Sequence, residues 1–515
     1  MSRAGRSASK RGGARAPRAV RRALFTGLAL VATAAGCSGG YGRLRATSHI
    51  TVALTSGDVG TGDARLPLDL TQGTPFSVHV EAHNGDGSVD TTFNGWVRLS
   101  SKPGAITPVE GPGASGRNVH LDNGRADVST RVLGAYGDSR IWAEDLGYVP
   151  VDPTRSPPPA CADGRDNNGD GTIDYPNDPG CAYPNDDTEE IGSYVAGTTD
   201  VIHFVYPRVA DVRGIAQGGG ATSFPHDQVQ IDTGYRPAEN KFAFSLVVTR
   251  IAADGFYVTD LDDPRGFTSI FAYNFSAPPR LRVCDRLTGL NATASDFFGF
   301  TELGFPTWQT EEWDPRVRPC LVPEPFVLSP ASLNDTSVKL NKESALVRVV
   351  SSDPYSVHVG SHFGKGFPSP PGFTPTETAS NCDINNDGKI DFYHDPEMSC
   401  SAACDSDPEC SEYSNFAGRS EFFLVVHDGS PGAFPTDAKV QVNASTAALI
   451  DPLALRGKPI KAFTGTFRYF SGGSQFTIEA RCQDDIVVDP AAQPLTSDKA
   501  CVYPRTASDQ NNASN

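Results

Sequence analysis

Phe76-Ser77-Val78-His79-Val80-Glu81-Ala82 alternates apolar and polar side chains along its whole length. A period of two residues is typical of a β-strand that has one face on a core and the other in water. Similar short runs recur along the 515-residue chain, separated by turns such as Asn123-Gly124. Long helical patterns are few, and the chain contains 51 glycines and 40 prolines. The sequence therefore predicts an all-β protein.

Residues 41–150 contain further strand patterns of the same kind: Val97–Leu99, Val119–Leu121, Ala126–Val128 and Ile141–Ala143. Their order resembles that of bacterial immunoglobulin-like domains of surface proteins, in which a strand, a G-x-V-x-L segment, an N-G-x-A hairpin and a final strand follow one another. The resemblance implies an Ig-like β-sandwich over 41–150 that acts as a spacer or adhesive module. An unrelated sandwich of the same class is the alternative.

Residues 200–310 carry a second series of strand patterns: Val248-Thr249, Gly255–Asp260, Ile270–Tyr273, Asp285–Gly289 and Gly299–Leu303. This order resembles the OB-like modules found beside bacterial secreted nucleases, and it implies an OB-like β-barrel. Residues 325–490 repeat the type with Ala345–Val350, Glu421–Val426, Ile460–Tyr469 and Phe476–Ala480. We expect a second OB-like barrel there, with residues 361–420 inserted between two of its strands.

OB-like barrels often bind oligonucleotides or oligosaccharides on one face. In that case four aromatic residues of the first barrel would form a stacking platform: Phe256, Tyr257, Phe271 and Tyr273. Alternating aromatic residues in short strands are more often core residues, and this interpretation is favoured. The nuclease domain that accompanies such modules is absent from the sequence.

Two ten-residue stretches, Asp166–Tyr175 and Asp383–Phe392, share the pattern D-x-N-x-D-G-x-I-D-aromatic, and Asp-Pro follows three residues later. Side-chain oxygens at positions 1, 3, 5 and 9 and the carbonyl at position 7 surround a hard cation, while the glycine at position 6 allows the sharp turn. The isoleucine at position 8 is expected to pin each loop to a core. A plain Asx/Gly turn is the alternative for a single copy. Two matched copies favour Ca2+, and Mg2+ fits less well because it retains its waters.

These loops resemble the calcium loops of EF-hands, dockerins and thrombospondin type 3 repeats. They depart from the EF-hand at position 12, where Asn177 and His394 replace the bidentate glutamate. Nearby prolines argue against an exiting helix, so the thrombospondin type is closer. The missing glutamate suggests dissociation constants on the order of 0.1–1 mM. The expected ligands are Asp166, Asn168, Asp170, the Thr172 carbonyl, Asp174 and Asp178 for one ion, and Asp383, Asn385, Asp387, the Lys389 carbonyl, Asp391 and Asp395 for the other.

The N-terminus has the features of a secretory signal peptide. Residues 1–22 carry eight Lys or Arg residues and no acid, and an apolar run follows from Ala23 to Ala35. The ending Ala34-Ala35-Gly36-Cys37 resembles a bacterial lipobox, which implies removal of residues 1–36 and lipidation of Cys37. An ordinary signal peptide or a single membrane anchor is the alternative. Ser38 follows the cysteine, and the lipobox resemblance then implies the outer membrane, with the periplasmic or outward side left open.

Removal of the leader changes the formal net charge from −17 to −25. An acidic surface repels phosphate backbones, so generic binding of nucleic acid is disfavoured. The same charge suits an exported protein that holds cations on clustered carboxylates.

The chain has eleven cysteines, and lipidation of Cys37 leaves an even number. We expect five disulfides in an oxidising compartment, since no paired C-x-x-C motif supports zinc. Cys161 and Cys181 bracket the first calcium loop. The other sequence neighbours are Cys284 with Cys320 and Cys482 with Cys501, while the pairing within a group of four beside the second loop stays open: Cys382, Cys400, Cys404 and Cys410.

The connecting segments are assigned by composition. Residues 151–190 combine a proline-rich linker, 151–160, with the first calcium loop, which a metal and a disulfide would order into a rigid joint. Residues 502–515 form a polar, loose tail.

Catalytic motifs are missing from the sequence, including H-E-x-x-H, G-x-S-x-G, the P-loop and the dinucleotide fingerprint. We therefore expect a calcium-binding, lipid-anchored cell-surface protein that works as a binding or scaffold module without catalysis. Its expected partners are the membrane, through the lipid anchor, and a surface glycan or protein. Two alternatives stay open: an accessory or divergent subunit of a secreted nuclease or phosphoesterase, and a glycan-binding adhesin.

Overall fold

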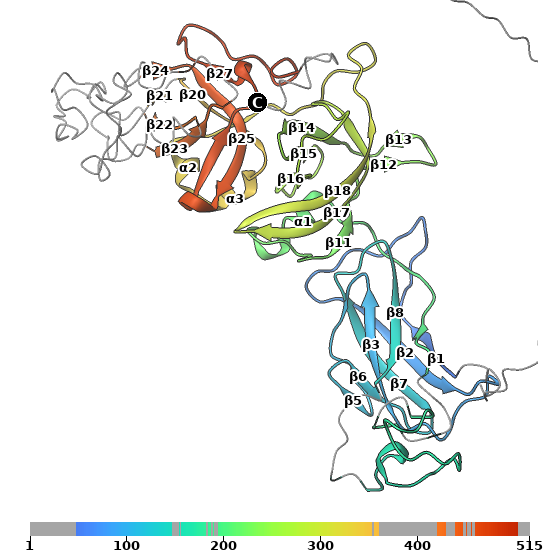
Figure 1. Cartoon of the computed structure of the whole chain (residues 1–515). Coiled ribbons are helices and arrows are strands. Elements are labelled where there is room, and N and C mark those ends of the chain that lie inside the picture. The colour runs from blue at the N-terminus through green and yellow to red at the C-terminus, as the bar shows by residue number, and fades with distance from the viewer. Residues whose placement is uncertain are drawn as a thin grey trace, which may run out of the picture. The chain divides into compact units, whose positions relative to one another are not determined.

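The fold is built from strands with a few short helices, which confirms the all-β prediction (Figure 1). No helix in the described part of the chain is long and apolar enough to cross a membrane. Cys37, the second calcium loop and the four cysteines beside it lie outside the described residues. The computed structural model describes residues 48–146, 154, 156–181, 184–186, 189, 194–352, 355–359, 420–428, 438–445, 450, 455 and 459–502.

The first module is a sandwich of two antiparallel sheets. One sheet has the order β1 (His49–Ser56), β2 (Thr74–His83), β7 (Arg125–Leu133) and β4 (Ala105–Ile106). The other has the order β10 (Ile202–His203), β8 (Asp138–Asp145), β3 (Trp96–Lys102), β6 (Asn118–His120) and β5 (Ala114–Ser115), and β9 (Gly197–Thr198) also pairs with β8.

The alternation of residues 76–82 places one face of β2 in the sandwich core. Val78 and Val80 are fully buried, and Val78 lies opposite Val128 across the β2–β7 ladder. The turn between β6 and β7 has positive φ at both Asn123 and Gly124, as a tight hairpin turn requires. A Cβ on Gly124 would meet the Asp90 carbonyl oxygen at 2.1 Å, so this position excludes larger residues.

The sandwich also recruits chain from beyond residue 150. Strands β9 and β10 pair with β8, and Ile202 lies opposite Ser139. The side chains of Tyr194 and Phe204 are buried in the sandwich core. The sequence pattern does not predict this part of the sandwich, because β9 and β10 have only two residues each and show no alternation.

The second module is a five-stranded barrel (Figure 1). Hydrogen bonding follows the order β17-β14-β15-β16-β18, and β17 also pairs with β18, which closes the barrel. Strands β16 and β18 are parallel and the other pairs are antiparallel, which is the strand order of an OB-fold. The bounds are β14 (Leu246–Ala252), β15 (Gly255–Asp260), β16 (Ser269–Tyr273), β17 (Arg286–Phe297) and β18 (Phe300–Glu311).

Smaller elements precede and flank this barrel. Strand β11 pairs with the outer edge of β17, and a separate two-stranded hairpin follows it. The elements are α1 (Val209–Val212), the 3-10 turn Ile215–Gln217, β11 (Gln228–Gln230), β12 (Tyr235–Arg236) and β13 (Lys241–Phe242).

The third module repeats the OB order, with its first strand split into β20 and β21. Hydrogen bonding runs β20-β25-β26-β23-β22-β21-β24, and β23 pairs with β26 in parallel. Strand β21 ends at Val359 and its antiparallel neighbour β22 begins at Glu421, so the predicted insertion connects these two strands. The bounds are β19 (Phe326–Val327), β20 (Leu346–Val350), β21 (Ser356–Val359), β22 (Glu421–His427), β23 (Ala438–Asn443), β24 (Pro459–Ile460), β25 (Ala462–Phe470), β26 (Gln475–Glu479) and β27 (Ile486–Val487).

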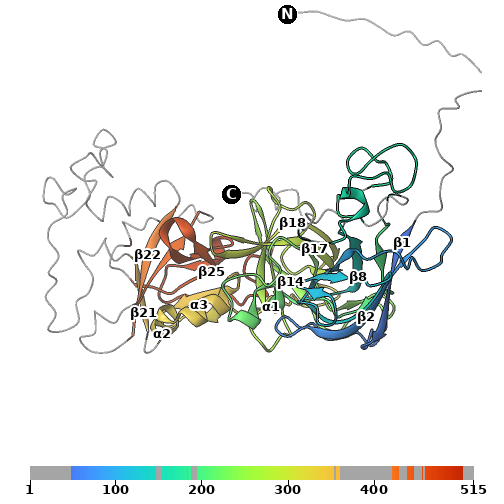
Figure 2. The same ribbon diagram turned by 90° about the horizontal axis from the view of Figure 1, so that it is seen from below.

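Two short helices precede β20, α2 (Pro330–Asn334) and α3 (Thr336–Lys342) (Figure 2). Ser329 caps α2 and Asp335 caps α3, because their side chains accept backbone N–H groups of the first turn. Two 3-10 turns complete the module, Ser471–Gly473 and Gln483–Asp485.

Three of the expected disulfides are present. Cys161–Cys181, Cys284–Cys320 and Cys482–Cys501 join the neighbours that the sequence suggested. The expected pairs among Cys382, Cys400, Cys404 and Cys410 lie outside the described residues.

Candidate metal centre

The first calcium loop lies in a segment that the Cys161–Cys181 disulfide closes. A 3-10 turn at Ala160–Ala162 begins the segment, and the Tyr175 N–H donates to the Cys161 carbonyl at 3.1 Å. The expectation that Ile173 pins the loop to a core is wrong, since its side chain is 47% exposed. The segment has no apolar core that Ile173 can join, because its buried positions are held by the two cysteines and by Asp178. The Cys161–Cys181 disulfide and polar contacts therefore order this loop.

Asp166, at loop position 1, folds its carboxylate over the turn. Its Oδ1 accepts the Gly169 N–H at 2.6 Å, and its Oδ2 accepts the Gly171 N–H at 3.0 Å. Both glycines have positive φ, which brings these N–H groups round to one side. Each carboxylate oxygen keeps a lone pair for a further donor or an ion.

Asn168 and Asp170, at positions 3 and 5, make the next two turns. The Asn168 Oδ1 accepts the Asp170 N–H at 2.9 Å, and the Asp170 Oδ1 accepts the N–H and hydroxyl of Thr172. These bonds from Thr172 lower the pKa of Asp170, so the carboxylate stays ionised at neutral pH.

Asp174, at position 9, connects the end of the loop to its beginning. Its Oδ1 accepts the Asp163 N–H at 3.2 Å, and its Oδ2 accepts the Gly164 N–H at 2.9 Å. Asp174 itself has a φ of 54°, a left-handed conformation that aspartate tolerates better than most residues. The loop is thereby held closed without help from an apolar contact.

Asp178 and Glu189 form the buried part of the centre. Both residues are buried, with exposed fractions of 1% and 2%. A carboxylate oxygen of each lies within 4.8 Å of the other and of the Cys181 sulfur. That sulfur belongs to the disulfide and is no thiolate ligand, which leaves the two carboxylates as the candidate donors.

Glu189 reaches across the loop from beyond the disulfide. Its Oε2 accepts the N–H groups of Asn167 and Asn168, and its Oε1 accepts the Asp174 N–H at 3.3 Å. The Asn168 amide in turn donates to Asp178 Oδ2 at 3.4 Å and to the Glu189 carbonyl at 2.6 Å. Asn168, Asp178 and Glu189 therefore share one site.

This donor set fits a calcium ion. Two ligands on opposite sides of one Ca2+ lie about 4.6–5.2 Å apart, since each oxygen stands at about 2.3–2.6 Å. Two buried carboxylates destabilise the fold unless a cation balances them, and within the described ranges neither has a Lys or Arg partner. Asp166 and Asp170, by contrast, lie on the exposed side of the loop.

The sequence missed Glu189 because it stands eight residues after the second cysteine. The only sequence signal is the acidic run Asp186–Glu190, and nothing in it tells which carboxylate turns inward. The expected ligands Asp383, Asn385, Asp387, Lys389, Asp391 and Asp395 lie outside the described residues.

A second cluster of carboxylate and sulfur atoms, at Cys482, Asp484 and Cys501, is accounted for by a disulfide and a backbone hydrogen bond. Asp484 lies between Cys482 and Cys501, which are bonded to each other, and it accepts the Cys501 N–H at 3.1 Å. Its neighbour Asp485 is paired with Arg481 at 2.9 Å.

The ligand face that OB-folds use is closed in the first barrel. Phe256 lies in the barrel core, while Tyr257 and Phe271 form a cluster against which Tyr469 of the third module packs. All three of the barrel residues are 0% exposed. The Arg468 guanidinium stands 5.5 Å from the Phe271 ring centre. The core interpretation of these aromatics is therefore confirmed for Phe256. Tyr257 and Phe271 are covered by the chain itself, while Tyr273, the fourth predicted member of the platform, is partly exposed.

Comparison with known proteins identifies no family. No family model matches the chain, and no curated protein matches it. One solved structure, dimeric latent PorU from Porphyromonas gingivalis, shares 11% identity over 50% of this chain and 29% of that chain, with a TM-score of 0.15. This chain thus spans less than a third of the length of that neighbour, and the likeness carries no argument.

Proposed function

We propose that the protein is an exported, lipid-anchored surface protein whose modules bind or display, and whose connecting loop is stabilised by calcium. The observation that carries this proposal is the buried pair Asp178 and Glu189, which lies against the Cys161–Cys181 disulfide and has no basic partner in the described part of the chain. A Ca2+ ion supplies the missing positive charge and takes oxygen ligands. The disulfide suits an oxidising compartment.

A structural role for the ion agrees with its surroundings. Asp178 and Glu189 are nearly inaccessible, and the backbone N–H groups of the loop occupy part of each carboxylate. A catalytic ion needs open positions for water and substrate. These enclosed ligands therefore favour stabilisation of the joint over turnover at the ion.

The calcium titration of residues 38–515 by calorimetry tests the proposal. We expect saturable binding with dissociation constants on the order of 0.1–1 mM. Asp178→Asn removes one of the charges and weakens one site about tenfold or more, whereas Asp498→Asn, at an exposed position, leaves both sites unchanged. Absence of calcium binding at 10 mM would remove the calcium part of the proposal.

The anchor is tested separately in a Gram-negative host. We expect the full chain to incorporate labelled palmitate and to fractionate with the outer membrane. Cys37→Ser removes the modified thiol, so the label and the membrane association are lost together. A chain that stays membrane-bound and unlabelled contradicts lipidation without affecting the calcium site.

A further inference from the structure

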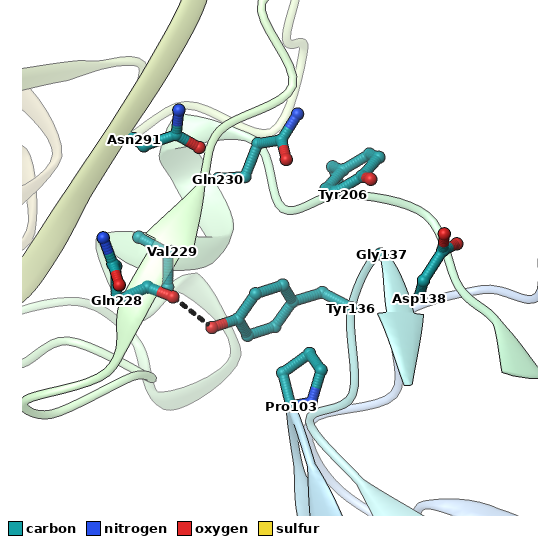
Figure 3. Close-up of a pocket in the computed structure, with 9 residues that line it drawn as sticks. All are labelled: Pro103, Tyr136, Gly137, Asp138, Tyr206, Gln228, Val229, Gln230 and Asn291. Atoms are coloured by element: carbon teal, nitrogen blue, oxygen red, sulfur yellow. Dashed lines mark hydrogen bonds between the residues drawn. The ribbon is translucent and has the colours of Figure 1, made fainter. Parts of the chain in front are cut away.

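A cavity of about 320 Å³ lies where the sandwich meets the first barrel (Figure 3). Tyr136 of the sandwich fixes this joint, since its ring belongs to the barrel's core cluster and stands 5.4 Å from Phe224. Its hydroxyl donates to the Gln228 carbonyl at 2.7 Å. Burial, with a smaller effect of Asp227, raises the pKa of Tyr136 to about 12, so the hydroxyl remains a donor at neutral pH.

The barrel side of the cavity presents three amides. Strand β11 reads Gln228-Val229-Gln230, and Val229 is buried in the barrel core, so alternation turns both glutamines to the other face. Asn291 of β17 lies directly opposite Gln230 in the ladder. Such partners have Cβ atoms about 4.5–5.5 Å apart. The side-chain amides of these three residues have no protein hydrogen-bond partner in the described structure. All three residues line the cavity, with Gln228 and Gln230 at exposed positions.

The sandwich side presents a fixed aromatic ring, Tyr206. Gly137 lies directly against it, because a Cβ there would meet the ring at 2.6 Å, and Gly137 has a φ of +61°. The Arg65 guanidinium stands 5.1 Å from the centre of the same ring. Pro103 adds a second apolar surface beside Tyr136 (Figure 3).

Asp138 supplies the single charge of the lining. Its Oδ1 accepts hydrogen bonds from Arg65 and His203, both at 3.0 Å, while its Oδ2 has no partner in the described structure. Burial acts to raise the pKa of Asp138, but the bonds from His203 and Arg65 outweigh it and hold the pKa below its ordinary value. One acceptor is therefore free to face a ligand hydroxyl.

These groups together select a class of ligand. No basic residue is among those that line the cavity in the described structure, and Arg65, which lies beside Tyr206, is already paired with Asp138, so a phosphate or carboxylate ligand is poorly balanced there. Each amide offers a donor and an acceptor side by side, which matches the neighbouring hydroxyls of a sugar. The aromatic and proline rings can pack against the C–H faces of a sugar ring. Small-ligand sites of about 300 Å³ and larger are common at domain junctions. We propose that this cavity binds one ring of a neutral sugar, held by Gln230, Asn291 and Asp138 against Tyr206.

Ligand-observed NMR and calorimetry on residues 38–515 test this site, which does not depend on the calcium loop. The probes are glucose, galactose, mannose and N-acetylglucosamine, with inorganic phosphate, glucuronate, adenosine and triglycine for comparison. We expect at least one neutral sugar to bind with a dissociation constant on the order of 1 mM, as one small ring allows. The comparison compounds bind more weakly.

Variants locate the binding. Gln230→Ala and Asn291→Ala each remove an amide and weaken sugar binding about tenfold, and Tyr206→Ala abolishes it. Tyr206→Phe keeps the ring and retains most of the affinity. Gln493→Ala, a glutamine exposed far along the sequence, is the matched control and changes nothing. Melting temperatures confirm that each variant is folded.

Three results would overturn the proposal. The first is absence of binding by all four sugars at 50 mM. The second is sugar binding that Tyr206→Ala, Gln230→Ala and Asn291→Ala all leave unchanged. The third is tighter binding of phosphate, glucuronate, adenosine or triglycine than of any neutral sugar.

Discussion

At the scale of single residues, Glu189 connects the two ends of the first predicted calcium loop. It is 2% exposed and accepts N–H groups from both ends of the loop motif, at Asn167, Asn168 and Asp174. The EF-hand places its bidentate glutamate at position 12, which is Asn177 in this chain. Glu189 therefore supplies a glutamate carboxylate to the loop from a position outside the motif.

Glu189→Gln is expected to weaken calcium binding at one site about tenfold or more. The amide keeps an oxygen acceptor but removes a negative charge from a buried site, where charge is the larger part of the attraction for Ca2+. Calorimetric titration measures the change. Glu110→Gln, an exposed position outside the loop, is the control. Equal affinities for the two variants would mean that Glu189 is no ligand.

Glu343 is a second buried carboxylate, and it makes stability depend on pH. Burial raises its pKa to about 7, against the opposing effect of Arg213. Its pKa in the unfolded chain is about 4.3. The folded state thus holds the proton of Glu343 more tightly than the unfolded chain does. The stability that this protonated carboxyl contributes is fully present below about pH 4.3 and is lost as the pH rises through about 7.

Glu343→Gln tests this linkage. The variant has no carboxyl to titrate at this position. The free energy of unfolding of the wild type is therefore expected to fall relative to that of Glu343→Gln as the pH rises from about 4.3 to 7. Urea denaturation at a series of pH values gives the curve. A difference that is constant over this range would show that the carboxyl of Glu343 has an ordinary pKa in the fold.

At the scale of elements, Arg213 joins α1 to α3. It is 0% exposed, pairs with Glu343 at 2.9 Å, and donates to the carbonyls of Ser269, Leu340 and Glu343. A single side chain thereby connects the first barrel with the helix that precedes β20. Removal of one partner of such a buried pair leaves the remaining charge and carbonyls unsatisfied.

Arg213→Met is expected to lower the free energy of unfolding by about 3–5 kcal/mol, because methionine fills the space without replacing the four hydrogen bonds of the guanidinium. Chemical denaturation measures the loss. Arg117→Met, at an exposed arginine, is expected to change stability by less than about 0.5 kcal/mol. A loss below 1 kcal/mol for Arg213→Met would contradict the role of this pair.

Strand alternation explains why much of the fold was predictable. Residues 76–82 alternate and lie in β2, whereas residues 255–260 and 269–273 are continuous runs that the resemblance to OB-like modules located, and they form β15 and β16. Strand β23 was missed although its own sequence alternates, whereas β9 and β10 were missed because each has only two residues and is selected by pairing with the distant β8. The same limit applies to the cavity, whose two walls lie about 90 residues apart in sequence, as Tyr136 and Gln228 show with a separation of 92.

The first candidate metal site was predictable only in part. The loop motif located Asn168 and Asp178, since their spacing follows the turn chemistry of calcium loops. Glu189 was not predictable, because the disulfide and the backbone of the loop decide which distant acid turns inward. Ile173 was assigned wrongly, since apolar character alone does not tell whether a core lies within reach.

At the scale of the whole molecule, the relevant features are the disulfides and the negative net charge. Disulfides close three short segments, at sequence separations of 20, 36 and 19 residues. Our proposal places calcium in the first of these, where carboxylates are buried in a chain whose formal net charge is −17 before any leader is removed. Bound cations reduce self-repulsion and bind the folded state selectively, so they raise stability by mass action.

Thermal melting of residues 38–515 with 10 mM calcium and with chelator tests this account most directly. For a dissociation constant of about 0.1–1 mM, each site is expected to add about 1.4–2.7 kcal/mol, which raises the melting temperature by several degrees. Asp178→Asn is expected to remove a large part of the rise. Identical melting curves with calcium and with chelator would show that these loops are only turns, and the calcium account would be contradicted.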